Sequence, residues 1–279
     1  MKKVYLLPNS ITAFGLTCGL FVIFRVCMMD LDSSTYETVK FSAIVLLMAA
    51  FADLLDGAVA RAMKAESEFG EAFDSLADAV SFGVAPAIIT LKSVGLPPGS
   101  ELSFLLTMAA MIYSVCGILR LVRFSVQAKH AKDSDAMLLA HRKNFTGLPI
   151  PAAAAALVSA NLLLMSPGLG DIFPLPLEAQ LSFLIGAMVV LGYFMVSRWR
   201  FPSLKALQIR VASFQLVFTT AIGTVLFFYG VIYHFAVAFF VLSWTYVGTA
   251  CVLSAIRLIA GKKAKVLADF EPEPDSDVE

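Results

Sequence analysis

The sequence predicts an all-α polytopic membrane protein with about eight transmembrane helices and with both termini in the cytoplasm. Three observations support this fold class. Hydrophobic residues make up 59% of the 279-residue chain and charged residues only 15%, whereas about a quarter of a soluble domain is charged. Apolar runs of membrane-spanning length recur along the chain, and basic residues gather in alternate connections between them. The 21 basic and 21 acidic residues balance, so net charge gives no support to a nucleic-acid-binding protein.

Eight segments are long and apolar enough to cross a hydrocarbon core, which takes about 20 helical residues. In chain order they are approximately 8–29, 38–63, 72–94, 102–127, 150–166, 178–197, 211–229 and 232–258. Two lysines precede the first segment, as in a signal peptide, but no clean cleavage site follows it, so we interpret it as a span. The fifth begins between Pro149 and Pro151, which predicts a tilt or a kink.

The positions of the basic residues predict the orientation. Fourteen lysines and arginines lie in the terminal segments and in alternate connections, whereas the intervening connections 30–37, 95–101, 167–177 and 230–231 contain none. Basic connections stay on the cytoplasmic side of a membrane, so we expect both termini there. The expected parts are a six-helix membrane core at 1–210, two additional C-terminal transmembrane helices at 211–261, and a charged, disordered cytoplasmic tail at 262–279.

The second and third predicted spans contain four aspartates. Asp53 and Asp56 are three residues apart, and Asp74 and Asp78 are four apart, so each pair lies on one face of its helix. A carboxylate inside a membrane span costs about 2.5–3.5 kcal/mol on the insertion scale, or about 10–14 kcal/mol for four. A cost of this size indicates that the carboxylates have a charge partner or a function.

The spacing of the aspartates also predicts their depth in the membrane. The turn between the two spans is centred near Ser67, and Asp56 and Asp78 are each eleven residues from it. At a rise of about 1.5 Å per residue, both lie at one level, somewhat more than about 10 Å inside the cytoplasmic end. Asp53 and Asp74 lie within about two helical turns of that level. The four carboxylates are therefore expected to converge on one cavity.

The residues around this cavity favour a hard divalent cation. Only Arg61 and Lys64 are nearby cations in the sequence, and no histidine or cysteine joins the aspartates, which disfavours zinc. An acidic, all-oxygen site suits Mg²⁺ or Mn²⁺, as one ion or two, which would also bind phosphates. Two alternatives remain open at this point: an internal ion-pair network, and a proton or cation pathway of a transporter.

The aspartates belong to a longer pattern. It reads Asp-Leu-Leu-Asp-Gly-Ala-Val-Ala-Arg at 53–61, followed by eight residues and then by Gly70, Asp74 and Asp78 at steps of four. This pattern resembles the motif of the CDP-alcohol phosphatidyltransferase family at every fixed position, with eight specified residues over 26 positions.

Four further segments resemble the phosphatidylserine synthase branch of that family. They are Pro8-Asn9-x-Ile11-Thr12, DAVSFGVAPA at 78–87, GILRLVRFSV at 117–126 and NFTGLPIPAAAA at 144–155. One departure is Ser125, where that branch often has asparagine. The resemblance covers approximately residues 5–205.

The resemblance implies an enzyme of phospholipid biosynthesis that transfers the phosphatidyl group of CDP-diacylglycerol to the hydroxyl of L-serine, giving phosphatidylserine and CMP. It implies that Asp53, Asp56 and Asp74 are ligands of Mg²⁺ or Mn²⁺, and that Asp78 is both a ligand and the general base. The residues implied to contact CDP-diacylglycerol are Asn9, Gly57, Ala60, Arg61 and Gly70.

A serine pocket should contain a cation, because serine carries a carboxylate. Arg120 and Arg123, near the cytoplasmic end of the fourth span, are the main candidates, although arginines at such positions also reach toward lipid headgroups. Lys143 and Asn144 are further candidates.

Other functions and partners stay open. Within the family, the acceptor could instead be choline, inositol phosphate or glycerol phosphate, and a cation transporter is the alternative from a different class. The resemblance implies a bacterial cytoplasmic (inner) membrane with the active site opening to the cytoplasm, the lipid bilayer as the surroundings and a homodimer as one assembly. It implies no nucleic acid.

Overall fold

A computed structural model describes most of the chain, and every regular element in it is a helix. The described residues are 6–28, 35–63, 67–97, 99–131, 147–168, 175–197, 230 and 233–260. No strand occurs within these ranges, which confirms the predicted all-α class. The helices are α1 (Leu6–Cys27), α2 (Thr35–Ala62), α3 (Glu68–Asp78), a π-helical segment (Ala79–Val84), α4 (Ala85–Ser93), α5 (Glu101–Ala131), α7 (Ile150–Leu164), α9 (Leu177–Val196) and α11 (Phe235–Ala260).

Six helical spans in the described ranges are long and apolar enough to cross a membrane, so the protein is an integral membrane protein. They are α1, α2, the continuous run α3–π–α4, α5, α9 and α11, while α7 is a shorter apolar helix of 15 residues. Seven of the eight predicted spans thus coincide with helices, and the predicted span 211–229 lies outside the described residues.

The third span begins earlier than the hydrophobicity pattern predicts, at Glu68 instead of residue 72. Ser67 is the N-cap of α3, and its Oγ accepts a hydrogen bond of 3.0 Å from the Gly70 N–H. A serine cap of this kind fixes the first turn of a helix independently of apolar residues. The predicted turn near Ser67 is therefore confirmed.

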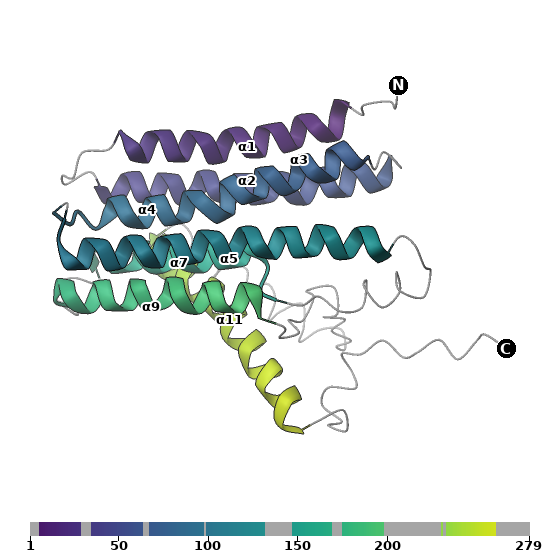
Figure 1. Ribbon diagram of the computed structural model, residues 1–279. Coiled ribbons are helices and arrows are strands. Elements are labelled where there is room, and N and C mark those ends of the chain that lie inside the picture. Colours follow the sequence, from purple (N-terminus) through teal and green to yellow (C-terminus); the bar gives the residue numbers. More distant parts are fainter. Residues whose placement is uncertain are drawn as a thin grey trace, which may run out of the picture.

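The helices form a bundle in which α1, α2, α3–α4, α5 and α9 run side by side, and α11 crosses them at a steep angle (Figure 1). α1 packs on α2, α5 on α9, and α7 on α11. α7 is strongly enclosed, with ten of its 15 residues buried. Its alanines leave room for neighbouring helices to approach closely.

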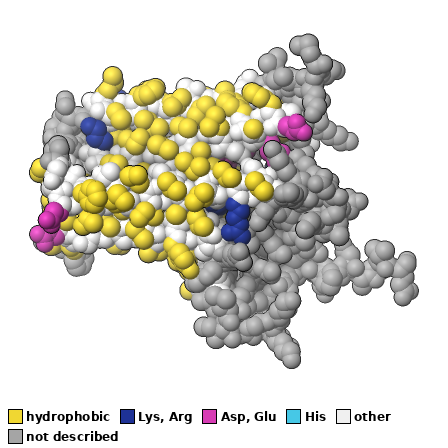
Figure 2. Space-filling view, in the orientation of Figure 1, with side chains coloured by type: hydrophobic (Ala, Val, Ile, Leu, Met, Phe, Trp, Pro, Cys, Tyr) yellow, Lys and Arg dark blue, Asp and Glu magenta, His cyan; other side chains and the backbone are white. Residues whose placement is uncertain are grey.

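The outer surface of the bundle is apolar. In Figure 2 hydrophobic side chains cover the visible face, and charged side chains lie toward its two ends. Large exposed residues on this surface include Phe51, Leu54, Phe104 and Val115. Such a band is expected where helices contact hydrocarbon instead of water.

Candidate active site

Three of the predicted aspartates meet between α2 and α3. One carboxylate oxygen from each of Asp53, Asp56 and Asp74 lies within 4.8 Å of the other two. Asp56 is 5% exposed, and the other two are half-buried. This spacing and donor chemistry fit a hard divalent cation, because its oxygen ligands lie at about 2.0–2.6 Å from the ion.

Asp78, one turn further along α3, faces the same cavity but does not belong to the group of three. The cavity is lined by Thr12, Gly15, Ala49, Asp53, Asp56, Asp74, Ala77, Asp78, Ser81 and Phe82. Asp78 interacts electrostatically with the three clustered carboxylates and with Arg120. It therefore lies beside the candidate metal ligands and within the electrostatic influence of a cation.

α1 contributes a polar contact to the cluster. The Thr12 hydroxyl is 2.6 Å from Asp56 Oδ2, to which it donates, and 3.2 Å from the Pro8 carbonyl oxygen. A hydrogen bond from a neighbouring side chain orients a carboxylate that binds a metal. Thr12 was not among the predicted site residues, although it belongs to the Pro8–Thr12 segment of the family resemblance.

Asn9 lies close to the start of α3. A Cβ atom at Gly70 would lie 3.1 Å from Ser67 Oγ and 3.2 Å from Asn9 Oδ1, so a glycine at this position lets α1 approach α3. The Asn9 Nδ2 is buried and has no hydrogen-bond partner. A buried donor of this kind is costly unless something pairs with it, so it is available to a bound ligand.

One end of α2 is predicted by the positive-inside rule to face the cytoplasm. This end carries Gly57, Ala60 and Arg61. Gly57 and Ala60 are half-buried and Arg61 is exposed. A Cβ atom at Gly57 would lie 3.4 Å from Arg61 Nη1, so the Arg61 side chain lies over Gly57. The Arg61 guanidinium therefore covers the helix face that continues from Asp53 and Asp56.

The two predicted arginines have different surroundings. Arg120 is largely buried and interacts electrostatically with Asp78 and with Tyr246 of α11, and its Nε is buried without a hydrogen-bond partner. Arg123 is half-buried, and its Nη1 donates a 3.2 Å hydrogen bond to the Val196 carbonyl at the end of α9. The structure thus brings Arg120 to the aspartates and places Arg123 elsewhere.

Two other candidates and one unpredicted residue complete the comparison with the sequence. Lys143 and Asn144 lie outside the described residues. Tyr246 was not predicted, because it lies in the last span, which carried no recognisable pattern. Within the described part of the chain, the buried side-chain nitrogens without a partner are Asn9 Nδ2 and Arg120 Nε, and both residues were predicted to bind substrate.

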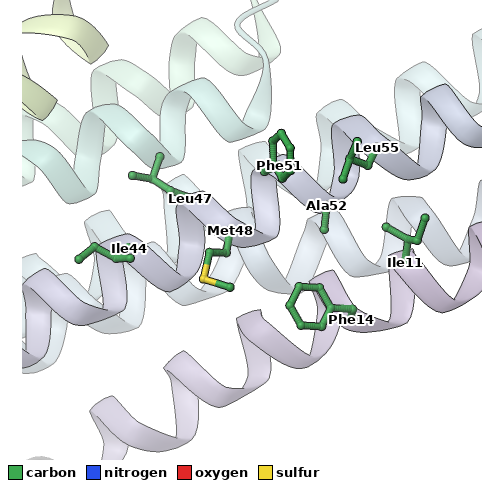
Figure 3. Close-up of a pocket in the computed structure, with 8 residues that line it drawn as sticks. All are labelled: Ile11, Phe14, Ile44, Leu47, Met48, Phe51, Ala52 and Leu55. Carbon is green, nitrogen blue, oxygen red and sulfur yellow. The ribbon is translucent and has the colours of Figure 1, made fainter. Parts of the chain in front are cut away.

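An apolar groove lies on the outer side of α1 and α2 (Figure 3). Its lining residues are Ile11, Phe14, Ile44, Leu47, Met48, Phe51, Ala52 and Leu55. Leu55 directly precedes Asp56, and Ile44 lies eleven residues earlier, a distance of about 16 Å along the helix at 1.5 Å per residue. The groove therefore begins at the level of the carboxylates and runs from there toward the middle of the bilayer.

Comparison with known proteins assigns the family. The model of the CDP-alcohol phosphatidyltransferase family matches residues 5–194. The chain is 35% identical to a *Helicobacter pylori* (strain J99) protein over 219 residues, which is 78% of this chain and 80% of that protein. It is 30% identical to a *Bacillus subtilis* (strain 168) protein over 203 residues, 71% of this chain and 91% of that one.

A *Methanocaldococcus jannaschii* protein is also 30% identical, over 190 residues, 68% of this chain and 73% of that protein. All three relatives are named CDP-diacylglycerol–serine O-phosphatidyltransferase. The chain belongs to the CDP-alcohol phosphatidyltransferase family. It is therefore an enzyme of the phosphotransferase class, and the transporter alternative is set aside.

Proposed function

We propose that this enzyme transfers the phosphatidyl group of CDP-diacylglycerol to the hydroxyl of L-serine and produces phosphatidylserine and CMP. The observation that carries the proposal is the juxtaposition of a three-carboxylate group, Asp78 and the buried Arg120. The names of the three relatives support serine as the acceptor.

In this proposal Asp53, Asp56 and Asp74 hold Mg²⁺ or Mn²⁺, as one ion or two, with Asp78 as a further ligand. Their oxygens within 4.8 Å of one another suit these hard cations. When bound, the cation neutralises charge on the diphosphate as it develops during phosphoryl transfer. Asn9, Gly57, Ala60, Arg61 and Gly70 bind the CDP portion of the lipid, with the free Asn9 amide as a donor.

Asp78 acts as the general base. It takes the proton of the serine hydroxyl, and the serine oxygen attacks the phosphorus that carries diacylglycerol. The new O–P bond forms as the bond from that phosphorus to the CMP oxygen breaks, and CMP leaves with the electron pair. Arg120 pairs with the serine carboxylate, since a guanidinium forms strong charge-assisted hydrogen bonds with carboxylates. Arg123 is a weaker candidate for binding the acceptor, because its side chain donates a hydrogen bond to α9. Lys143 and Asn144 also remain weaker candidates than Arg120.

The groove between α1 and α2 receives an acyl chain of the lipid substrate. A phosphate held at the level of Asp56 leaves its acyl chains to run toward the bilayer centre, which is the direction of the groove from Leu55 to Ile44. The positive-inside rule supports a cytoplasmic opening of the active site at the carboxylate end of α2, and the bacterial relatives support a bacterial inner membrane as its location.

We also propose that residues 1–210 form the catalytic core, with 211–261 as an extension. Tyr246 of α11 interacts electrostatically with Arg120, which supports a position of α11 near the acceptor side of the site. A homodimer is the proposed assembly, by family resemblance alone.

The test is CMP release from CDP-diacylglycerol by detergent-purified protein with Mn²⁺ or Mg²⁺. Serine, choline, inositol phosphate and glycerol 3-phosphate are offered separately. We expect release with serine alone, loss of release in Asp78→Asn, and no change in Glu178→Gln, which removes an exposed carboxylate on α9. Release with a different acceptor would overturn the assignment of serine while keeping the carboxylates.

A further inference from the structure

The helix that carries Asp74 and Asp78 changes form directly after Asp78. α3 ends there, the π-helical segment Ala79–Val84 follows, and α4 continues from Ala85. The Ala85 N–H donates to the Val80 carbonyl, five residues earlier, instead of four as in an α-helix. π turns inside α-helices are rare and occur frequently at functional sites.

Tyr113 of α5 stabilises this segment at one carbonyl. In an α-helix the Phe82 carbonyl would accept from residue 86, which is proline and has no N–H. The Tyr113 hydroxyl donates to the Phe82 carbonyl at 3.1 Å, and Tyr113 itself is 0% exposed. A buried hydroxyl on α5 therefore donates to a carbonyl whose α-helical donor position is a proline.

Close packing against α1 and α5 also holds the π segment in place. A Cβ atom at Gly19 of α1 would lie 2.9 Å from Ser81 Cα and Cβ, and one at Gly117 of α5 would lie 3.7 Å from Gly83 Cα. The Ser81 hydroxyl also donates to the Gly15 carbonyl at 3.4 Å. The segment has little room to shift.

The π segment reaches the catalytic cavity. Ser81 and Phe82 line the same cavity as Asp78 and the three clustered aspartates. Each residue of an α-helix turns it by about 100°, so one residue more or fewer in the turn after Asp78 changes the direction in which its carboxylate faces relative to α1 and α5.

We propose that Tyr113 is a positioning residue for the reaction: its hydrogen bond to the Phe82 carbonyl holds the π turn that directs Asp78 toward Asp53 and Asp74. The catalytic part of this inference rests on the proposed function, whereas the structural part does not. Tyr113 touches neither the lipid nor the acceptor in this role.

The first test compares two variants that each remove one side-chain donor to a main-chain carbonyl, a buried one at Tyr113 and a half-buried one at Trp244. Tyr113→Phe removes the hydroxyl, and the matched control Trp244→Phe removes the 3.0 Å bond from Trp244 Nε1 to the Ala156 carbonyl. We expect Tyr113→Phe to lower kcat roughly 10- to 100-fold, as displaced catalytic groups do, with KM for both substrates within about twofold. The control should keep kcat within about twofold at a similar loss of thermal stability. Equal kcat in both variants would overturn the proposal.

A second test distinguishes a role of Tyr113 in positioning Asp78 from a role in stabilising the fold. It can also be made if Tyr113→Phe alone does not fold. Pro86→Ala restores the N–H that an α-helical turn would direct at Phe82. We expect Pro86→Ala combined with Tyr113→Phe to give a stable protein whose kcat stays well below that of the wild type, because the π turn can then close to an α turn. Full recovery of kcat together with stability in the double variant would mean that the Tyr113 bond is only structural.

Amide hydrogen exchange tests the structural part of the proposal without a substrate, so its result does not depend on which alcohol is the acceptor. In Tyr113→Phe, exchange in residues 79–87 should rise several-fold above wild type, and unchanged exchange there would overturn the structural part. If the wild-type protein uses an acceptor other than serine, the same kcat comparison is made with that acceptor. Failure of the serine assignment is thus distinguished from failure of the Tyr113 proposal.

Discussion

Thr12 on α1 donates a hydrogen bond of 2.6 Å to Asp56 on α2, although the two residues are 44 positions apart in the sequence. Asp56 is 5% exposed, and Thr12 is 6% exposed. A carboxylate this buried needs a donor, and the hydroxyl also restricts the direction in which the carboxylate oxygens point. α1 is therefore part of the candidate metal site and not only a membrane anchor.

Thr12→Val should weaken metal binding more than it weakens the fold. Valine keeps the shape of threonine without the hydroxyl, so the carboxylate of Asp56 loses its orienting donor. We expect the Mn²⁺ concentration for half-maximal CMP release to rise roughly 10- to 100-fold, as for other residues that orient metal ligands.

The matched control for this prediction is Thr17→Val on the same helix. The Thr17 hydroxyl donates to the Ala13 carbonyl at 2.7 Å and is exposed. Its replacement should leave the metal dependence unchanged, and an equal shift in both variants would contradict the role assigned to Thr12.

Asp53→Asn should abolish activity and stabilise the metal-free protein. The three carboxylates repel one another when no cation is bound, because their oxygens lie within 4.8 Å. We expect CMP release to fall by roughly 10²-fold or more and the unfolding temperature in EDTA to rise. Thermal unfolding with and without Mn²⁺ measures both, and a lower unfolding temperature in EDTA would speak against a repelling cluster.

Arg120→Gln and Arg123→Gln should differ in their effect on serine. Arg120 is buried beside Asp78, whereas Arg123 donates to the Val196 carbonyl. Loss of a hydrogen bond to a charged group costs about 1.5–3 kcal/mol, so KM for serine should rise about 10- to 150-fold in Arg120→Gln. Steady-state kinetics at saturating CDP-diacylglycerol gives the comparison. A larger rise in Arg123→Gln would transfer the acceptor site to the end of α9.

Met48→Trp should interfere with the lipid substrate and not with serine. Met48 is 48% exposed in the groove of α1 and α2, and a larger ring there occupies the path of an acyl chain. We expect KM for long-chain CDP-diacylglycerol to rise several-fold, with roughly unchanged KM for a short-chain analogue. Val115→Trp on α5 is the control, since Val115 is 52% exposed outside the groove. Equal effects of both variants would mean that the groove does not select the chain.

The helical period and the membrane environment account for what could be predicted from the sequence. Apolar runs of about 20 residues define the spans, and the spacing of Asp53, Asp56 and Asp74 around the turn at Ser67 predicts that they face one another. These features depend on residues near in the chain or on one helical hairpin, so local periodicity is sufficient. The eight fixed residues of the motif then indicate the family.

The contacts between helices that are distant in the sequence could be identified only from the tertiary structure. Arg120 and Arg123 are one turn apart and look equivalent in the sequence, but only their neighbours on α9 and α11 distinguish a buried cation from a helix cap. Tyr113 and Phe82 are 31 residues apart, and nothing in either segment alone predicts that the Tyr113 hydroxyl would donate to the Phe82 carbonyl. The sequence by itself determines which side chains share a helical face, whereas the packing of the helices decides which faces meet, because crossing positions depend on the shapes of all the side chains between them.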